Sequence, residues 1–299
     1  MGWVGSSIAI SILQSGIVKE LLLNDIQKDI AEGEALDLNH SSSFLPSAKV
    51  RSAEIEEMKT CRAVIVTAGR GGKPGESRPE LLRENIEIAR NISRKLIGFE
   101  GLLIVVTNPV DALTHFYRVY TGLPEHRVIG TGTFLDSARL REIIGDRLKV
   151  DAKSIHADVI GEHGDTAVVM WSRAMVGSIP LRSWDGWSAD YENDIEREVR
   201  NAAQEIIKRK GATNHAIGLV TATLIKWLLR DERRVLTVAV ELTGQYGLKN
   251  IALSLPCLIS ADGIERIICP DLTDQETEKL MRSAREIDKT IQNGAQSGS

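Results

Sequence analysis

The sequence has few cysteines, no long apolar run and no excess of basic residues. Its three cysteines, Cys61, Cys257 and Cys269, are odd in number and lack metal-ligand spacing, so we expect free thiols, no disulfide framework and no metal site. No run of about eighteen apolar residues could cross a bilayer, and the chain does not open with a basic segment followed by a cleavable apolar one. These absences predict a cytoplasmic protein that is not bound to a membrane.

The charge balance is slightly acidic, with a net charge of −4 and a pI near 5.9. This leaves no overall basic field for nucleic acid, and the basic triplet at 208–210 is typical of a charged helix end. Because 42% of the 299 residues are hydrophobic, the chain can bury the core of one large or two ordinary domains.

Strand-like and helix-like runs alternate up to residue 130, the pattern of a doubly wound α/β domain. Residues 63–69 and 102–109 contain continuous apolar runs, which are typical of parallel strands buried on both faces. The pattern changes from residue 131 onward, and the elements expected there are helices at 136–148, 196–210, 214–230 and 274–291 and antiparallel strands at 154–160, 168–179, 234–242, 251–259 and 263–268. We therefore predict a dinucleotide-binding domain over 1–130 and an α+β substrate domain over 131–299.

The first residues resemble the dinucleotide fingerprint G-x-G-x-x-G from its second position onward. Gly2 and Gly5 have the spacing of its second and third glycines, with Val4 between them, and the first glycine and its strand would precede Met1. Asp25 ends a short apolar run about twenty residues later, where a carboxylate binds the adenosine ribose hydroxyls and repels a 2′-phosphate. The pattern predicts a Rossmann domain that lacks its first strand and binds NAD rather than NADP.

Ligands of open parallel sheets bind at the carboxyl ends of the strands. The residues expected at those ends, and hence at the cofactor, are Ala68, Gly69, Val106, Asn108 and Thr131. The glycine-rich, charged segment that follows, 69–78, is either an idle surface loop or a hinged lid that brings Arg78 inward over a substrate.

One histidine, His163, lies in a polar, glycine-flanked bend after an apolar run. By itself it would indicate no more than a hydrogen-bonded histidine. Asp136 and Arg139 change the interpretation, because residues three apart share a helix face and can point into one pocket. An imidazole held by a carboxylate can give a proton to a carbonyl oxygen, and a guanidinium can bind a carboxylate through two hydrogen bonds. The set predicts hydride transfer to an oxo acid.

Arg141 and His156 are expected to point away from that centre. Arg141 is rotated by roughly 200° from Arg139 around a helix, and His156 is an odd number of residues from His163, so on a regular strand the two would face opposite sides. They are either ordinary surface residues or an anion site at a subunit contact.

Three motifs now stand in one order and spacing: Thr-Asn-Pro-Val-Asp at 107–111, Leu-Asp-Ser-Ala-Arg at 135–139 and Gly-Glu-His-Gly-Asp-Thr at 161–166. With them the chain resembles the lactate and malate dehydrogenase family over essentially its full length. The resemblance implies His163 as the acid/base group, Asp136 as its partner, Arg139 as the carboxylate clamp, Arg78 as the lid arginine that polarises the carbonyl, and Asn108 as a contact of substrate and nicotinamide.

Within this family the lactate branch fits better than the malate branch. Segment 211–218 resembles the lactate-type segment, whose threonine, here Thr213, lies by the substrate side chain. Arg141 and His156 match the positions at which bacterial lactate dehydrogenases bind fructose 1,6-bisphosphate across a subunit interface. The resemblance therefore implies an allosteric homotetramer that acts on a small 2-oxo or 2-hydroxy acid.

The chain departs from the family pattern at two places. Gly72 stands where the family has its substrate-selecting residue, usually glutamine for lactate and arginine for malate. The fingerprint also lacks its first glycine and the strand before it. That strand is central in a sheet of this kind, so its absence would leave a gap that weakens NAD binding and lowers stability. An added apolar strand ending in glycine should then raise both. The rival hypotheses are a malate dehydrogenase and a non-catalytic relative with an impaired cofactor site.

Gly72 generates a prediction about substrate choice. Without arginine the pocket lacks a counter-charge for a dicarboxylate, and without glutamine it is larger than pyruvate needs, while Ala202 and Ala203 leave room on the opposite wall. We expect a relaxed preference that includes longer 2-oxo acids. Steady-state rates with pyruvate, 2-oxobutyrate, 2-oxoisocaproate and oxaloacetate measure it, and a strong preference for oxaloacetate would refute it.

Overall fold

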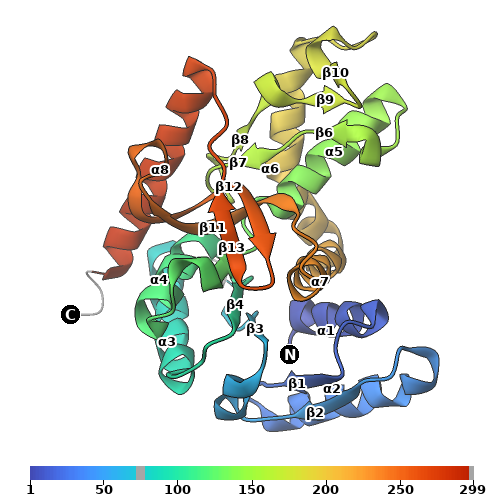
Figure 1. Ribbon diagram of the computed structural model, residues 1–299, viewed down its shortest axis with the longest axis vertical. Helices are drawn as coiled ribbons and strands as arrows, with labels where there is room; N and C mark the ends of the chain where they lie inside the picture. Colours follow the sequence, from blue (N-terminus) through green and yellow to red (C-terminus); the bar gives the residue numbers. More distant parts are fainter. Residues whose placement is uncertain (72–77, 296–299) are drawn as a thin grey trace.

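The computed structural model describes residues 1–71 and 78–295. Helices surround the strands in this described part (Figure 1), and none of its helices is both long and apolar enough to cross a membrane. The helices are α1 (Trp3–Ser15), α2 (Lys28–His40), α3 (Arg78–Lys95), α4 (Val110–Thr121), α5 (Phe134–Leu148), α6 (Asp190–Lys210), α7 (His215–Leu229) and α8 (Asp274–Ala295).

The strands fall into one large sheet and three small ones among the described residues. They are β1 (Glu20–Leu23), β2 (Lys49–Ser52), β3 (Ala63–Val66), β4 (Leu102–Val105), β5 (Val128–Gly130), β6 (Ile155–His156), β7 (Val159–Ile160), β8 (Val168–Val169), β9 (Met175–Val176), β10 (Ile179–Pro180), β11 (Val235–Thr243), β12 (Lys249–Ser260) and β13 (Gly263–Ile267). The large sheet has the order β13-β12-β11-β5-β4-β3, and its β3, β4 and β5 are parallel. The apolar runs that predicted β3 and β4 are therefore confirmed as parallel strands.

The N-terminal half contains the gap that the late fingerprint predicts. β1 pairs in parallel with β2 in a sheet of their own, separate from the sheet that ends at β3. Figure 1 shows the N-terminus between β3 and β1. In a 3-2-1-4-5-6 sheet the first strand fills this place, so α1 is packed where the sheet is interrupted.

The C-terminal meander joins the sheet of the N-terminal half. β11 pairs antiparallel with β5, with Ala239 opposite Gly130, and β12 and β13 extend the same sheet. The sequence pattern does not show this pairing. Without it, β5 would be an edge strand with unpaired backbone groups. One sheet thus carries residues from both halves of the chain.

The strand expected at 154–160 is broken into two short pieces. β6 pairs with β9, whereas β7 pairs with β8 in another sheet. The prediction that His156 and His163 face opposite sides assumed one regular strand, and that assumption is wrong: Gly161, with a φ of 86°, ends β7 before His163 is reached. Figure 1 shows β6, β9 and β10 together with α5 and α6 at one end of the molecule.

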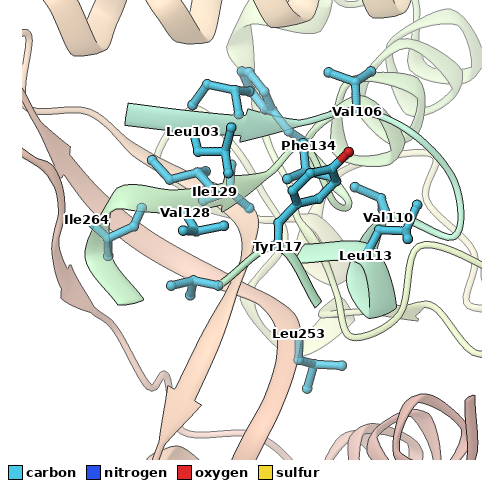
Figure 2. Close-up of a cluster of buried hydrophobic side chains, with 14 of the residues drawn as sticks. Leu103, Val106, Val110, Leu113, Tyr117, Val128, Ile129, Phe134, Leu253 and Ile264 are labelled. Carbon is cyan, nitrogen blue, oxygen red and sulfur yellow. The ribbon is translucent and has the colours of Figure 1, made fainter. Parts of the chain in front are cut away.

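The main hydrophobic core lies between the large sheet and the helices that cover it. Figure 2 shows part of it, with Leu103 of β4, Ile129 of β5, Tyr117 of α4 and Leu253 of β12 drawn together. These side chains are fully buried or nearly so. They hold the carboxyl ends of β4 and β5 in place, and those ends carry the candidate site.

Ile104 on β4 tests how much this core contributes. Its side chain is 0% exposed, so Ile104→Ala should cost about 2–5 kcal/mol of unfolding free energy because it leaves a cavity. Ile97 is 62% exposed, and Ile97→Ala should stay within about 0.5 kcal/mol of the parent. Urea unfolding of the two variants makes the comparison; similar losses would show that the sheet is not the centre of the core.

Candidate active site

His163 lies in the bend that follows β7. The chain leaves β7 through Gly161, whose positive φ suits glycine. The Gly161 N–H donates to the carbonyl of Ser254 on β12 at 2.9 Å, and the Ser254 N–H donates back to Gly161 at 3.1 Å. β12 therefore fixes the direction in which the bend carries His163.

The start of α5 is attached to the same strand, β7. Thr133 Oγ1 donates to the carbonyl of Val159 at 2.5 Å, and the Val159 N–H donates to Ser137 Oγ at 2.9 Å. These two bonds flank Asp136 in the first turn of α5. Backbone and hydroxyl groups thus hold the start of α5 against β7, and Ser137 of the 135–139 motif is one of them.

The structure brings His163, Asp136 and Arg139 into one cluster. His163 Nδ1–H donates to Asp136 Oδ2 at 2.6 Å, and Arg139 Nη1 donates to Asp136 Oδ1 at 3.0 Å. Asp136 is buried and His163 is half-buried. The bond at Nδ1 leaves Nε2 of the imidazole as the nitrogen available to a substrate.

The charges in this cluster support each other. Burial lowers the pKa of His163, but the Asp136 carboxylate outweighs burial, and the pKa rises to about 8. Burial likewise raises the pKa of Asp136, yet the charge and hydrogen bond of His163, together with Arg139, hold this pKa below its ordinary value. At neutral pH the cluster therefore holds a charged imidazolium beside an ionised carboxylate.

Side chains that the sequence analysis did not single out hold the bend of residues 161–166. The His163 N–H donates to Asp111 Oδ2 at 2.8 Å, and the Glu162 N–H donates to Ser283 Oγ at 2.6 Å. Thr166 is bound by the Glu162 carboxylate. Asp111 is part of the 107–111 motif, so a signal was present, whereas Ser283 lies on α8, more than a hundred residues away, where no local pattern marks it.

The strand ends expected at the cofactor lie at one edge of the sheet. The Val106 N–H donates to Val66 at 3.0 Å, and the Thr131 N–H donates to Val105 at 2.9 Å. Thr107 Oγ1 donates to the carbonyl of Ala68 at 2.9 Å. The backbone of Gly69 lies directly against the Thr107 side chain. The structure therefore brings Ala68, Gly69, Val106 and Thr131 together.

The start of α1 has features that fit a dinucleotide. Gly2 is its N-cap, with no side-chain cap and no acidic residue in the first turn, so the first N–H groups and the positive helix end suit a pyrophosphate. A Cβ on Gly5 would lie 3.1 Å from Thr67 Oγ1, so α1 lies close to the end of β3. Val4 is half-buried in the first turn.

Asp25 lies beside the start of α1, because its carboxylate contacts the Met1 ammonium. Burial raises the pKa of Asp25, but this ammonium and the Gln27 N–H outweigh burial and keep the pKa below its ordinary value. An ionised carboxylate here can accept hydrogen bonds from ribose hydroxyls, so the residues at this edge fit NAD.

Two further candidates lie on segments attached to this edge. Asn108 has its carbonyl bound by Asn85 Nδ2 at 3.1 Å. Thr213 is half-buried in the connection between α6 and α7, and the next residue, Asn214, donates to Ser7 Oγ of α1 at 2.8 Å. The segment carrying Thr213 is thus fastened to the helix that begins at the cofactor edge.

Two predicted site residues cannot be placed. Gly72 lies outside the described residues, and so does the side chain of Arg78, whose backbone begins α3.

The side chain of Arg141 contacts the backbone of the residue that follows His156. Arg141 Nε donates to the carbonyl of Ala157 at 3.0 Å, and its guanidinium is paired with Asp158. His156, the residue before Ala157, is exposed on β6. The pair is partly accessible, with a carboxylate beside the arginine.

Gly161 makes the geometry of the bend testable. Its φ is 86°, and a Cβ there would lie 2.7 Å from Ser283 Oγ. Gly98 has the same φ of 86° but open space around it, so Gly98→Ala measures the backbone cost alone, about 1–2 kcal/mol. Gly161→Ala should cost clearly more in thermal unfolding. Equal losses would mean that the bend is not packed against α8 as described.

Comparisons with known proteins agree with this geometry. Residues 1–130 match the family model described as lactate/malate dehydrogenase, NAD binding domain, and residues 133–297 match lactate/malate dehydrogenase, alpha/beta C-terminal domain. The chain is 39% identical over 300 residues to an L-lactate dehydrogenase of Acetivibrio thermocellus, covering 97% of this chain and 95% of that protein. It is 42% identical over 302 residues to one of Fervidobacterium nodosum, with 97% and 95% coverage.

Solved structures give the same result. A lactate dehydrogenase from a Medee basin deep-sea metagenome library superposes with a TM-score of 0.95 at 37% identity, covering 99% of this chain and 96% of that one. The minor L-lactate dehydrogenase of Enterococcus mundtii in its ligand-bound form also gives 0.95 at 37% identity, with 98% and 95% coverage. With its acid–histidine pair beside an edge that fits a dinucleotide, and both halves matched by family models, the chain belongs to the lactate/malate dehydrogenase family and is an NAD-dependent dehydrogenase.

Proposed function

We propose that this protein is an L-lactate dehydrogenase that interconverts pyruvate and L-lactate. The observation that carries the proposal is the hydrogen bond from His163 Nδ1 to Asp136 at 2.6 Å, which keeps a proton donor charged next to Arg139. Relatives named L-lactate dehydrogenase at about 40% identity over nearly the whole chain support this substrate.

Reduction of a ketone needs a proton at the oxygen while the carbon is reduced. The start of α1, Asp25 and the strand ends would hold NADH, which would supply the hydride when bound. His163 is charged at neutral pH and gives its Nε2 proton to the substrate oxygen, which becomes the hydroxyl. Asp136 stays ionised and holds the ring through Nδ1, so the imidazole ends neutral and takes up a proton from solvent.

Arg139 orients the substrate. It is mostly buried and uses Nη1 for Asp136, and its other N–H groups can bind the substrate carboxylate as a planar pair. Asn108 contacts the substrate and nicotinamide in this proposal, and Arg78 polarises the carbonyl. When Arg139 binds the carboxylate of the substrate, the keto group of the same molecule lies toward His163.

Selectivity depends on Thr213 and Gly72 in this proposal. Thr213 lies by the substrate side chain, and Gly72 supplies no arginine for a second carboxylate. Ala202 and Ala203 are half-buried on α6, and their small side chains support acceptance of longer 2-oxo acids.

The protein acts in the cytoplasm as a homotetramer in this proposal. Support for subunit contact comes from large apolar side chains exposed on α1, α2 and α7: Trp3 is 72%, Leu36 61% and Leu219 62% exposed. These helices also surround a cavity of about 600 Å³. Large exposed apolar side chains on helices that border one cavity support an association surface.

Arg141 and His156 form the proposed site for fructose 1,6-bisphosphate. Their partial exposure and the guanidinium charge of Arg141 support it, although binding must displace Asp158 from Arg141. Adding the bisphosphate to the activity assay tests this assignment directly.

The pKa of His163 sets the pH dependence. Because only protonated His163 can reduce pyruvate, kcat/KM for pyruvate with NADH should be level below pH about 8 and fall about tenfold per pH unit above it. Lactate oxidation needs neutral His163 and should rise up to the same pH. Asp136→Asn removes the charge that raises this pKa. The pH profiles of pyruvate reduction and of lactate oxidation should therefore both shift to lower pH.

Absorbance of NADH with pyruvate measures these profiles. His163→Gln should lower the rate at least about a hundredfold, whereas His126→Gln, half-buried in the connection before β5, should not. An unchanged rate in His163→Gln, or a wild type inert with pyruvate, would contradict the proposed function.

A further inference from the structure

Three polar side chains follow one face of the last helix, α8. Glu276, Lys279 and Ser283 are separated by three and four residues, so they lie on the same side of the helix. Glu276 and Ser283 are buried, and the Lys279 side chain is 50% exposed. Leu280 and Ala284, which are also buried on α8, are apolar. Buried polar groups need hydrogen-bond partners, and the partners of these three residues, the α8 stripe, come from other elements.

Ser283 binds the catalytic bend of residues 161–166. Its Oγ accepts the Glu162 N–H at 2.6 Å and is hydrogen-bonded to Thr166 Oγ1 at 3.2 Å. Thr166 in turn binds the Glu162 carboxylate. The bend is therefore attached to α8 through both its backbone and a side chain.

The other two residues of the α8 stripe bind different elements. Lys279 Nζ donates to the two carboxylate oxygens of Glu196 on α6 at 3.1 and 3.4 Å, and Glu196 Oε1 also accepts the Trp171 Nε1–H at 2.9 Å. Glu276 accepts the Ser172 N–H at 2.9 Å and the Ser172 hydroxyl at 2.7 Å. Trp171 and Ser172 belong to one short 3₁₀ turn. This part of the stripe thus attaches α8 to α6 and to that turn.

The turn and α6 belong to the hydrophobic cluster that also holds α5. This cluster contains Trp171, Val199 of α6 and Leu140 of α5. Leu140 follows Asp136 by four residues, about one helical turn, so a shift of the cluster would move the carboxylate of Asp136 as well. α8 therefore reaches both sides of the acid–histidine pair: Ser283 binds the bend, and the rest of the stripe binds the cluster that holds α5.

We propose that Lys279 and Ser283 are positioning residues for the reaction: through α8 they fix the catalytic bend relative to α5, and so set the contact between His163 and Asp136. The inference rests on the proposed function for its catalytic meaning. Lys279 acts through Glu196, and Ser283 acts through the backbone of the bend. A hydrogen bond of 2.6 Å between His163 Nδ1 and Asp136 leaves little room for displacement. α8 is thus a structural link between the two partners of the pair.

Lys279→Met is the decisive variant, because Lys279 makes no described hydrogen bond or ion pair with the catalytic bend. Methionine keeps an unbranched stem but removes the charge, so Glu196 keeps Trp171 while the link from α6 to α8 is lost. Amide hydrogen exchange of the peptide that contains residues 161–166, measured by mass spectrometry without substrate, should become at least about threefold faster. Ser283→Ala removes the acceptor of the Glu162 N–H itself and should give a larger increase.

The catalytic effect is measured with pyruvate and NADH. In Lys279→Met, kcat should fall about three- to tenfold while KM for NADH stays within about twofold, because a displaced acid–histidine pair slows the chemical step and leaves cofactor binding intact. A merely structural role would lower the melting temperature and leave kcat unchanged at temperatures well below unfolding.

Two matched controls are available. Lys289 lies on α8 as well, but its described ion pair is with Glu286 of the same helix, so Lys289→Met should change neither the exchange of residues 161–166 nor kcat. Ser93 on α3 is fully buried like Ser283, but its Oγ has no hydrogen-bond partner in the described part of the chain. Ser93→Ala should therefore leave the exchange of the bend as it is in the wild type.

Wild-type exchange of residues 161–166 in a folded Lys279→Met protein would overturn the proposal, and so would an equal increase in Lys289→Met. If Ser283→Ala does not fold, the comparison of Lys279→Met with Lys289→Met decides. Faster exchange of the bend in Lys279→Met, combined with a wild type that is inert with pyruvate, would support the link through α8 and refute only the proposed function.

Discussion

The buried contact between His163 and Asp136 is the interaction on which the rest of this site depends. Each group alone would lose its charge on burial, and each keeps it because the other lies at 2.6 Å. Such a pair tolerates little misplacement, since a separated charge is costly in a buried site. The fold meets this demand with contacts from elements distant in sequence: Ser254 on β12, Ser283 on α8 and Asp111 on α4 all hold the bend that carries the imidazole.

Much of this arrangement could be predicted from local patterns. Continuous apolar runs identified β3 and β4, and helical spacing placed Asp136 and Arg139 on one face of α5. The glycines and the late start of the fingerprint predicted the interruption between β1 and β3. These features succeed because each depends on residues close together in the chain.

What could not be predicted depends on partners far away in sequence. The pairing of β11 with β5 and the separate partners of β6 and β7 are choices between strand edges, which no periodicity specifies. Asn24 directly follows the apolar strand β1, and its side chain donates to the carbonyl of Ala53 at 2.8 Å. Polar anchors of this kind are visible only once the chain is folded.

The pairing of Gly130 with Ala239 has a mechanical consequence. This bridge between β5 and β11 joins the two halves inside the core, and a rotation of one half against the other would have to break it. The halves should also melt in one cooperative transition, because neither retains a complete sheet when the other is lost.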